Sequence, residues 1–233
     1  MAQNPDTTPR SSSGRTLALQ KRRFYLLFLL LLAYLILYPY TQQGGFDYLG
    51  FRVFGSATTL LSIFAISFRR SFVLVALLLA IPTLIQRLLL PNDNGGSFAL
   101  FSTSLLFVFD VFIVVVIFRR VFATDQPNSE TIYGALCIYL LVGFGFASMY
   151  GMLASVQPHA FYLDPTSNLR QIPDRFDFIY YSFGTMTSLG ASGITPVSDQ
   201  ARSISVIEAI LGVLYLAVLI ARLMGAYQNR SPA

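Results

Sequence analysis

Between Phe176 and Pro196 the chain contains a run of threonine, serine and glycine whose backbone could do chemistry: FDFIYYSFGTMTSLGASGITP. An aromatic, amphipathic segment leads into this run, which lacks the bulk to pack as a core. Two long apolar segments, Ile132–Leu153 and Ile204–Met224, flank it. At membrane depth, irregular backbone is tolerated only where protein buries it or where it lines a water-filled path. The pattern therefore predicts a short helix and a re-entrant loop beside an ion pathway.

The composition is typical of a membrane protein. Hydrophobic residues make up 55% of the 233 positions, charged residues make up 12%, and the mean hydropathy is +0.61. A soluble domain carries roughly a quarter charged residues. The single cysteine, Cys137, excludes an intramolecular disulfide framework and a cysteine-based metal cluster. No nucleophile–base set emerges and the basic residues form no nucleic-acid patch, so we expect neither an enzyme nor a nucleic-acid partner.

Apolar segments of about 20 residues predict six transmembrane helices. These are Phe24–Tyr40, Leu49–Phe68, Phe72–Leu90, Phe98–Phe118, Ile132–Leu153 and Ile204–Met224. If both termini are inside, the inside segments hold most of the basic residues, as the positive-inside rule expects. Those residues include Lys21, Arg22, Arg23, Arg69, Arg70, Arg119, Arg120 and Arg222. We therefore expect a multi-pass protein of the cell membrane with cytoplasmic N- and C-termini, in contact with the lipid bilayer.

A polar break at residues 124–130 divides the chain. It contains Pro127, Asn128 and Ser129, and either Asn128 or Ser129 is expected to cap the helix that follows. The predicted units are a disordered cytoplasmic tail at 1–23, a four-helix membrane domain at 24–123, the linker at 124–130, a second membrane domain at 131–228 and a short cytoplasmic tail at 229–233. The second domain would comprise an outer helix, a proline-rich exposed loop at Ser155–Pro173 (the turret), the re-entrant loop and a last helix.

The residues from Asp177 to Gly225 read DFIYYSFGTMTSLGASGITPVSDQARSISVIEAILGVLYLAVLIARLMG. This segment resembles, without a gap, the pore module of the tetrameric potassium-channel superfamily, especially its bacterial members. The preceding span resembles the outer pore helix more loosely, and the four earlier spans match only in number and topology. The resemblance implies an all-α integral membrane protein with six transmembrane helices, a re-entrant pore helix and filter loop, and a homotetrameric pore.

The resemblance also implies which residues bind ions. Thr185 falls at the end of the pore helix, and the filter positions follow it. They are Thr187, Ser188, Leu189, Gly190, Ala191, Ser192 and Gly193. A potassium filter binds its ions through rings of backbone carbonyls. No cofactor or resident metal is expected, only permeant K⁺ and, through an altered filter, Na⁺.

Three filter positions depart from the family's Thr-Val/Leu-Gly-Tyr-Gly-Asp pattern. Ala191 replaces tyrosine, Ser192 replaces the second glycine and Gly193 replaces aspartate. Alanine removes the ring that normally braces the filter, and serine adopts a left-handed backbone only at a cost of roughly 1 kcal/mol or more. We expect the inner two ion sites to persist and the outer part to be wider or collapsed.

The altered filter leaves two functions open. The first is a cation channel that passes K⁺ passively or is weakly selective for monovalent cations. The second is a non-conducting or regulatory subunit that co-assembles with related channel subunits. A small transporter would need two related halves, which the sequence does not contain.

Three residues outside the filter each have more than one possible role. Asp110 lies in mid-span, where it would pair with an arginine, line a polar crevice or make a structural hydrogen bond. Glu208 would support the pore loop from behind or face the ion path, and Gly212 would act as a gating hinge or allow close helix packing. The span Phe98–Phe118 has no arginine at every third position, so we expect no voltage gating.

Overall fold

The structure, a computed structural model, describes most of the chain. The described ranges are 23–37, 45–66, 70–89, 97–123, 128–168, 172–190 and 193–228. Within them the elements are α2 (Arg23–Leu37), α3 (Gly45–Ala65), α4 (Arg70–Leu89), α5 (Ser97–Phe122), α6 (Ser129–Val156), β1 (Phe161–Leu163), α7 (Arg175–Met186), β2 (Ile194–Pro196) and α8 (Asp199–Gln228). The predicted tails, apart from Arg23, and the filter residues Ala191 and Ser192 lie outside the described residues.

The predicted helical character is confirmed, because α2 to α6 and α8 coincide with the six apolar segments. By length and composition, two of the described helices are suited to cross a membrane: Ser129–Val156 and Asp199–Gly225. Shorter apolar helices lie at Arg23–Leu37, Gly55–Ala65 and Arg70–Ile85. The expectation of an all-α fold needs one correction, since the described residues include two strands of three residues each.

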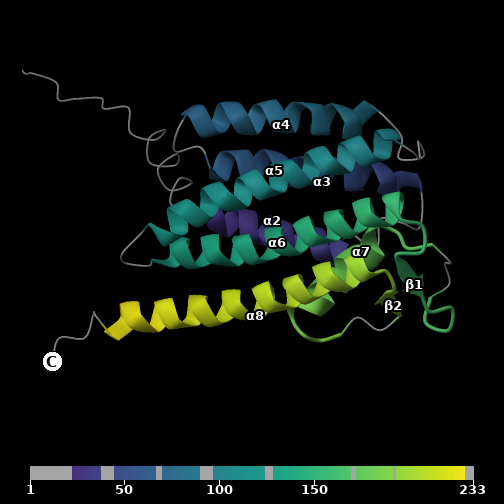
Figure 1. Ribbon diagram of the computed structural model, residues 1–233. Coiled ribbons are helices and arrows are strands. Elements are labelled where there is room, and N and C mark those ends of the chain that lie inside the picture. The colour runs from purple at the N-terminus through teal and green to yellow at the C-terminus, as the bar shows by residue number, and fades with distance from the viewer. Residues whose placement is uncertain are drawn as a thin grey trace, which may run out of the picture.

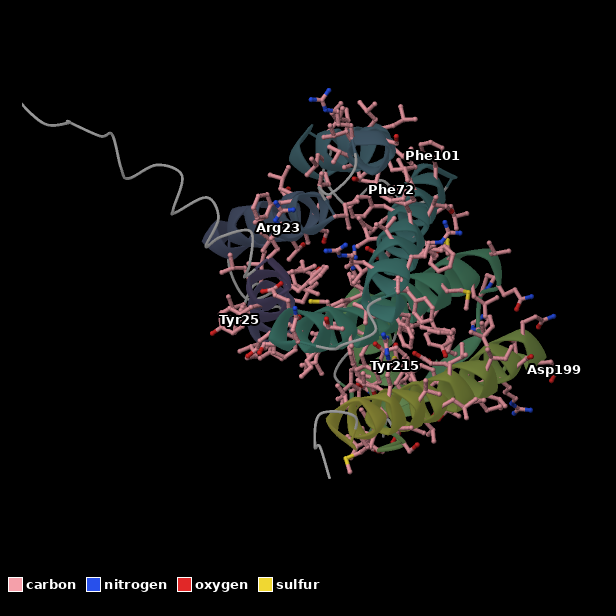
Figure 2. All side chains as sticks on the ribbon, turned by 90° about the vertical axis from the view of Figure 1, so that its left-hand side faces the viewer. Arg23, Tyr25, Phe72, Phe101, Asp199 and Tyr215 are labelled. Atoms are coloured by element: carbon pink, nitrogen blue, oxygen red, sulfur yellow. The ribbon has the colours of Figure 1, made fainter. Side chains whose placement is uncertain are left out.

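Helix α6 lies at the centre of the structure. Figure 1 shows it between α8 on one side and the group of α2 to α5 on the other, with α7 and both strands gathered at one end. Figure 2, which looks along the helices, shows the same order, with Tyr215 between α8 and α6. The Tyr215 hydroxyl donates to the carbonyl of Ala135 at 2.6 Å. The central position of α6 agrees with its burial, since 61% of the apolar stretch of α6 is buried, compared with 22% of the apolar stretch of α8.

Helix α8 therefore presents a long apolar face that the other described residues do not cover. The exposed apolar residues of this face are Val206, Ile207, Ile210, Leu211, Val213, Leu214, Leu216, Val218, Ile220 and Met224. Such a face is stable in contact with lipid or with other apolar surfaces, and it is larger than monomeric soluble proteins usually expose.

Small residues on α6 allow its neighbours to approach closely. A Cβ atom at Gly143 would lie 2.8 Å from the Phe183 ring of α7. A Cβ atom at Gly134 would lie 2.7 Å from Val121 of α5. Close backbone approach at small residues is a common way for membrane helices to associate, and here it brings α7 directly onto α6.

Strands β1 and β2 join the turret to the segment after the filter. They pair antiparallel, with Phe161 opposite Pro196, Tyr162 opposite Thr195 and Leu163 opposite Ile194. Phe161 and Leu163 are buried, whereas Tyr162 is exposed, as the alternation of a strand requires. The turret was predicted only as an exposed loop, yet this part of it is paired and two of its three side chains are buried.

Helix α7 begins with a reciprocal capping box. The Asp174 carboxylate accepts hydrogen bonds from the backbone N–H groups of Phe176 at 2.8 Å and Asp177 at 3.0 Å. The Asp177 carboxylate accepts one from the N–H of Asp174 at 2.8 Å. This arrangement satisfies N–H groups that the first turn of a helix leaves without partners, and it fixes where the short helix starts.

The capping box gives the first testable prediction. Asp174→Ala removes the acceptor and should lower the free energy of unfolding by about 1 kcal/mol. Asp174→Asn keeps an acceptor oxygen and should stay close to the unchanged protein. The thermal unfolding midpoint of the purified protein in detergent measures both. Equal loss in the two variants would mean that the cap is not what stabilises the start of α7.

Candidate ion pathway

The residues after α7 keep their N–H groups turned toward that helix. The N–H of Thr187 donates to the carbonyl of Phe183 at 3.0 Å, and that of Ser188 donates to Thr185 at 3.1 Å. The N–H of Gly190 donates to the carbonyl of Gly184 at 3.2 Å. Within the described residues no donor bonds to the carbonyls of Thr187–Gly190. These residues, called the filter segment below, therefore present carbonyl oxygens that the chain itself leaves available.

The backbone of the filter segment alternates in handedness. Ser188 has a φ of 57° and Gly190 a φ of 76°, whereas Leu189 between them has no positive φ. Residues of alternating handedness gather their N–H groups on one side, which leaves the carbonyls on the other. Leu189 is 76% exposed, so its side chain does not anchor the segment in the core. The C-terminal end of α7, which carries partial negative charge, points toward the same segment and favours a cation there.

The two threonines predicted at the end of the pore helix bond to their own helix. The Thr185 hydroxyl donates to the carbonyl of Tyr181 at 2.9 Å, and the Thr187 hydroxyl donates to that of Phe183 at 2.6 Å. Because each hydroxyl proton is used in this way, the oxygen of each presents only lone pairs to other partners. Near the filter segment these side chains can accept hydrogen bonds but not donate them.

Gly193, the last predicted filter residue, is held by the turret instead. Its carbonyl accepts hydrogen bonds from the N–H of Asp164 at 2.9 Å and from the Asn168 side-chain amide at 2.8 Å. Gly193 has a φ of 95°, in the region that favours glycine. The structure thus groups Thr187–Gly190 as one strip of available carbonyls and turns the Gly193 carbonyl toward the turret.

The turret turn, residues 164–168, is organised by one carboxylate. Asp164 accepts hydrogen bonds from the N–H of Thr166 at 3.0 Å, from the Thr166 hydroxyl at 2.7 Å and from the Ser167 hydroxyl at 3.1 Å. These bonds, the backbone one first, hold the pKa of Asp164 below its ordinary value. A lowered pKa means that the stabilisation is present above the ordinary value and is lost only as the pH falls through the lowered one. The turn therefore keeps its charged acceptor at neutral pH.

Glu208 lies behind α7, fully buried. The Tyr150 hydroxyl of α6 donates to its Oε2 atom, and the Ser182 hydroxyl of α7 lies 2.5 Å from its Oε1 atom. Ser182 also reaches the carbonyl of Gly143 at 2.8 Å. One carboxyl group therefore connects α6, α7 and α8. This position fits support of the pore loop, because a fully buried group has no access to an open path.

A second hydroxyl pair reinforces the same contact. The hydroxyls of Tyr181 on α7 and Ser205 on α8 lie 2.6 Å apart, and Ser205 donates to the carbonyl of Ala201 at 2.7 Å. Tyr181 also stacks edge-on against Tyr150, with ring centroids 5.1 Å apart. The back of α7 is thus held by a polar network inside an aromatic environment.

Gly212 lies where α8 meets the end of α7. A Cβ atom at this position would lie 2.6 Å from the carbonyl oxygen of Met186 and 3.0 Å from its Cα atom. Both are backbone atoms, which a side chain cannot push aside cheaply. Of the two roles considered for Gly212, close packing has direct geometric support, and it sets the distance between α8 and the base of the filter segment.

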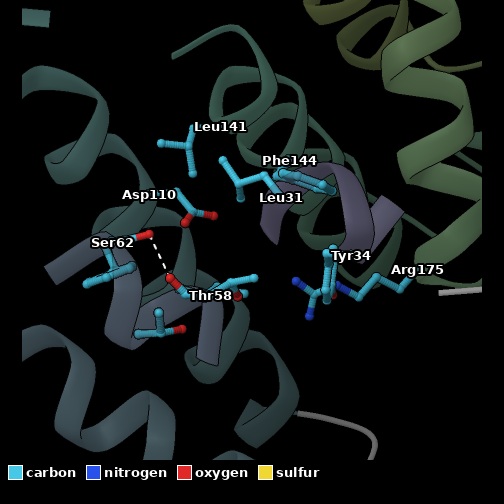
Figure 3. Close-up of a pocket in the computed structure, with 11 residues that line it drawn as sticks. Leu31, Tyr34, Thr58, Ser62, Asp110, Leu141, Phe144 and Arg175 are labelled. Carbon is cyan, nitrogen blue, oxygen red and sulfur yellow. Dashed lines mark hydrogen bonds between the residues drawn. The ribbon is translucent and has the colours of Figure 1, made fainter. Parts of the chain in front are cut away.

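Asp110 lies away from the filter segment, at a small cavity of about 40 Å³ whose lining combines apolar side chains with a few polar ones (Figure 3). The cavity is lined by Thr58, Thr59 and Ser62 of α3 and by Arg175, the first residue of α7. The hydroxyls of α3 donate to carbonyls of their own helix. A space of this size can hold a water molecule. Asp110 therefore shares this cavity with the hydroxyl residues of α3 and with Arg175, and its three possible roles stay predictions.

Several residues of the site carry no strong sequence signal. Tyr150 and Ser182 are polar residues inside apolar runs, which is a weak hint that they have partners. Asn168 is one amide in a proline-rich turret, and nothing local indicates that it reaches Gly193, 25 positions away. These contacts depend on how distant segments are brought together.

The Glu208 network gives the second prediction. Glu208→Ala removes the main acceptor of the buried Tyr150 hydroxyl and leaves Ser182 with the Gly143 carbonyl alone, so it should lower the free energy of unfolding by about 2 kcal/mol. Glu208→Gln keeps the volume and one acceptor, and should lose about half as much. Ser203→Ala, at an exposed position of the same helix, is the control. Thermal unfolding in detergent would refute the network if the Ala variant matched this control.

The contact at Gly212 gives the third prediction. Gly212→Ala forces α8 away from Met186 and should cost about 1–3 kcal/mol of stability. Gly225→Ala is the matched control on the same helix, because a Cβ atom there meets nothing within 4 Å. It should be neutral or slightly stabilising, since alanine favours a helix over glycine. Measurements of the free energy of unfolding of both variants test this contact. Equal stability of the two variants would contradict the close packing of Gly212 against Met186.

Comparison with known proteins agrees with this geometry. Residues 134–229 match a family model described as an ion channel, a two-span domain found in potassium channels. Searches of the curated proteins and of the solved structures gave no match. The family match covers nearly all of α6 together with β1, α7, β2 and α8, and does not extend to α2–α5. The filter segment and its supports lie within the part of the chain that is similar to ion channels.

Proposed function

We propose that the chain is one subunit of a homotetrameric channel that passes monovalent cations along the carbonyls of the filter segment. The observation that carries this proposal is the strip Thr187–Gly190, whose carbonyls accept no hydrogen bond from the described residues, while three of its four N–H groups bond to α7. Stacked rings of such carbonyls replace the hydration shell of a permeant ion. One chain supplies only one strip, so a closed ring requires further copies.

The apolar face of α8 supports assembly in a membrane. Only 22% of the apolar stretch of α8 is buried within the chain. In the proposed tetramer this helix is the inner helix, and its apolar residues contact neighbouring copies, the cavity or lipid. Such a face has no stable place in water.

The proposed orientation has six spans with both termini in the cytoplasm. In Figure 1 the start of α2, the end of α5 and the end of α8 lie at one end of the helices, and α7 with the strands lies at the other. Arg23, Arg119 and Arg120 therefore share the end at which the chain finishes. Basic residues at one end agree with the positive-inside rule, and the cell membrane is the proposed location.

We propose K⁺ as the main permeant ion, with weak discrimination against Na⁺. The filter segment retains glycine at position 190, in the left-handed conformation that the segment needs. Ala191 and Ser192 stand where the family's pattern has tyrosine and the second glycine, so the outer filter lacks the aromatic brace that holds its width. A wider outer filter discriminates less between K⁺ and Na⁺.

The altered residues at positions 191–193 also favour a second candidate function. A subunit with such a filter could assemble with related channel subunits and regulate them without conducting by itself. This candidate differs from the first in one measurable property, which is cation flux through the purified chain alone.

The fourth prediction tests these functions by flux in liposomes. The purified chain should pass K⁺ and, less readily, Na⁺. Gly190→Ala forces a side chain into a left-handed conformation, at a cost of about 1–2 kcal/mol in each subunit, and should reduce the flux at least tenfold. Gly225→Ala should leave it unchanged.

The outcomes separate the alternatives. A reversal potential at the K⁺ value with no Na⁺ current would refute weak selectivity but keep the channel. No flux from the chain alone, with altered currents when it is co-expressed with a conducting potassium channel, would favour the regulatory subunit. Equal flux through the unchanged protein and Gly190→Ala would refute the assignment of the filter segment.

A further inference from the structure

We propose that Asn168 is a positioning residue for the filter: its side-chain amide ties the turret turn to Gly193 and so fixes the outer end of the ion pathway. This inference rests on the proposed function and assigns to the turret a role in ion selection. The three residues Asp164, Asn168 and Gly193 are called the turret clamp below.

The Asn168 side chain uses both of its donors in the clamp. Its Nδ2 atom donates to the carbonyl of Gly193 at 2.8 Å and to that of Asp164 at 3.0 Å. The N–H of Asp164 donates to the same Gly193 carbonyl at 2.9 Å. A side-chain amide has two N–H donors, so this one is fully used, and the Gly193 carbonyl accepts two bonds from the turret.

The turret side of the clamp is itself held in place. The Asp164 carboxylate bonds to Thr166 and Ser167, and the N–H of Asn168 donates to the Asp164 carbonyl at 3.0 Å. Beyond the turn, β1 pairs with β2 through Leu163 and Ile194. The clamp is therefore attached to a small sheet, and it does not depend on a free loop.

Gly193 fits this arrangement in shape as well as in hydrogen bonding. A Cβ atom at Gly193 would lie 2.9 Å from Asn168 Nδ2 and 3.2 Å from Ser167 Cβ. The φ of 95° also disfavours any other residue. The replacement of the family's aspartate by glycine is thus explained, because a larger residue would displace the amide that holds the carbonyl.

The clamp has a direct consequence for the pathway. The filter segment is attached to α7 up to its last residue, Gly190, whose N–H bonds to the carbonyl of Gly184. The outer end is fixed by the carbonyl of Gly193. Only positions 191 and 192 separate these two attachments, and both are small residues that provide no aromatic brace. The position of Gly193 therefore limits how wide the outer filter can become.

The fifth prediction compares two Asn168 variants with a turret control. Asn168→Asp is isosteric, removes both donors and sets a carboxylate against two carbonyl oxygens. Asn168→Ala removes the donors alone. Tyr162→Phe, at an exposed position of β1, is the control. Loss of a hydrogen bond of this kind corresponds to about a fivefold change in an equilibrium. The Na⁺/K⁺ permeability ratio in liposomes should therefore change about fivefold or more in Asn168→Asp and less in Asn168→Ala. It should not change in Tyr162→Phe.

A second measurement does not need flux. Hydrogen exchange at the Asp164 amide, followed by mass spectrometry of the full chain in detergent, should be about fivefold faster in both Asn168 variants than in the control. This readout tests the holding of Gly193 directly, and the permeability ratio tests its effect on ions.

The results distinguish failure of this inference from failure of the proposed function. If the unchanged protein conducts and both Asn168 variants keep its permeability ratio, the positioning role is overturned while the channel stands. If the unchanged protein carries no cation flux, the proposed channel fails, and exchange rates that match the control would also overturn the clamp. Faster exchange together with a changed ratio supports the inference in full.

Discussion

The structure of the candidate pathway depends on a buried carboxyl group. Glu208 sits on α8 and is bonded by hydroxyls from α6 and α7. A buried polar group of this kind is stable only when its partners are all in place, so the three helices can meet in one relative position. The contact of Gly212 with Met186 adds a steric limit in the same region. Together they determine where α7 ends, and therefore where the filter segment starts.

The filter is consequently held from two independent directions. From behind, α7 receives the N–H groups of the filter segment and is itself fixed by the Glu208 network. From outside, the turret turn receives the Gly193 carbonyl. The inner attachment belongs to the helices and the outer one to a small sheet and a carboxylate-centred turn. The two attachments share no residue, so a change in one leaves the hydrogen bonds of the other in place.

Much of the helical framework could be predicted from the sequence, because apolar length and capping residues are local signals. The six apolar segments coincide with helices, and Asn128 caps α6 through the N–H of Thr131 at 2.9 Å. The short strands could not be predicted, because three residues carry too little pattern and the pairing of Tyr162 with Thr195 is decided by tertiary structure. For the same reason, the role of Asn168 could not be predicted from the sequence. Its partner is identified only when the turret folds back over the filter exit.

The pairing of Asn168 with Gly193 also constrains how this sequence can evolve. Placing aspartate at position 193 alone would meet the Asn168 amide and an unfavourable backbone conformation, whereas changing Asn168 alone would remove one of the two hydrogen bonds to the Gly193 carbonyl. Each residue makes the replacement of the other unfavourable. The turret, which lies outside the filter segment, thus restricts which side chains position 193 can carry.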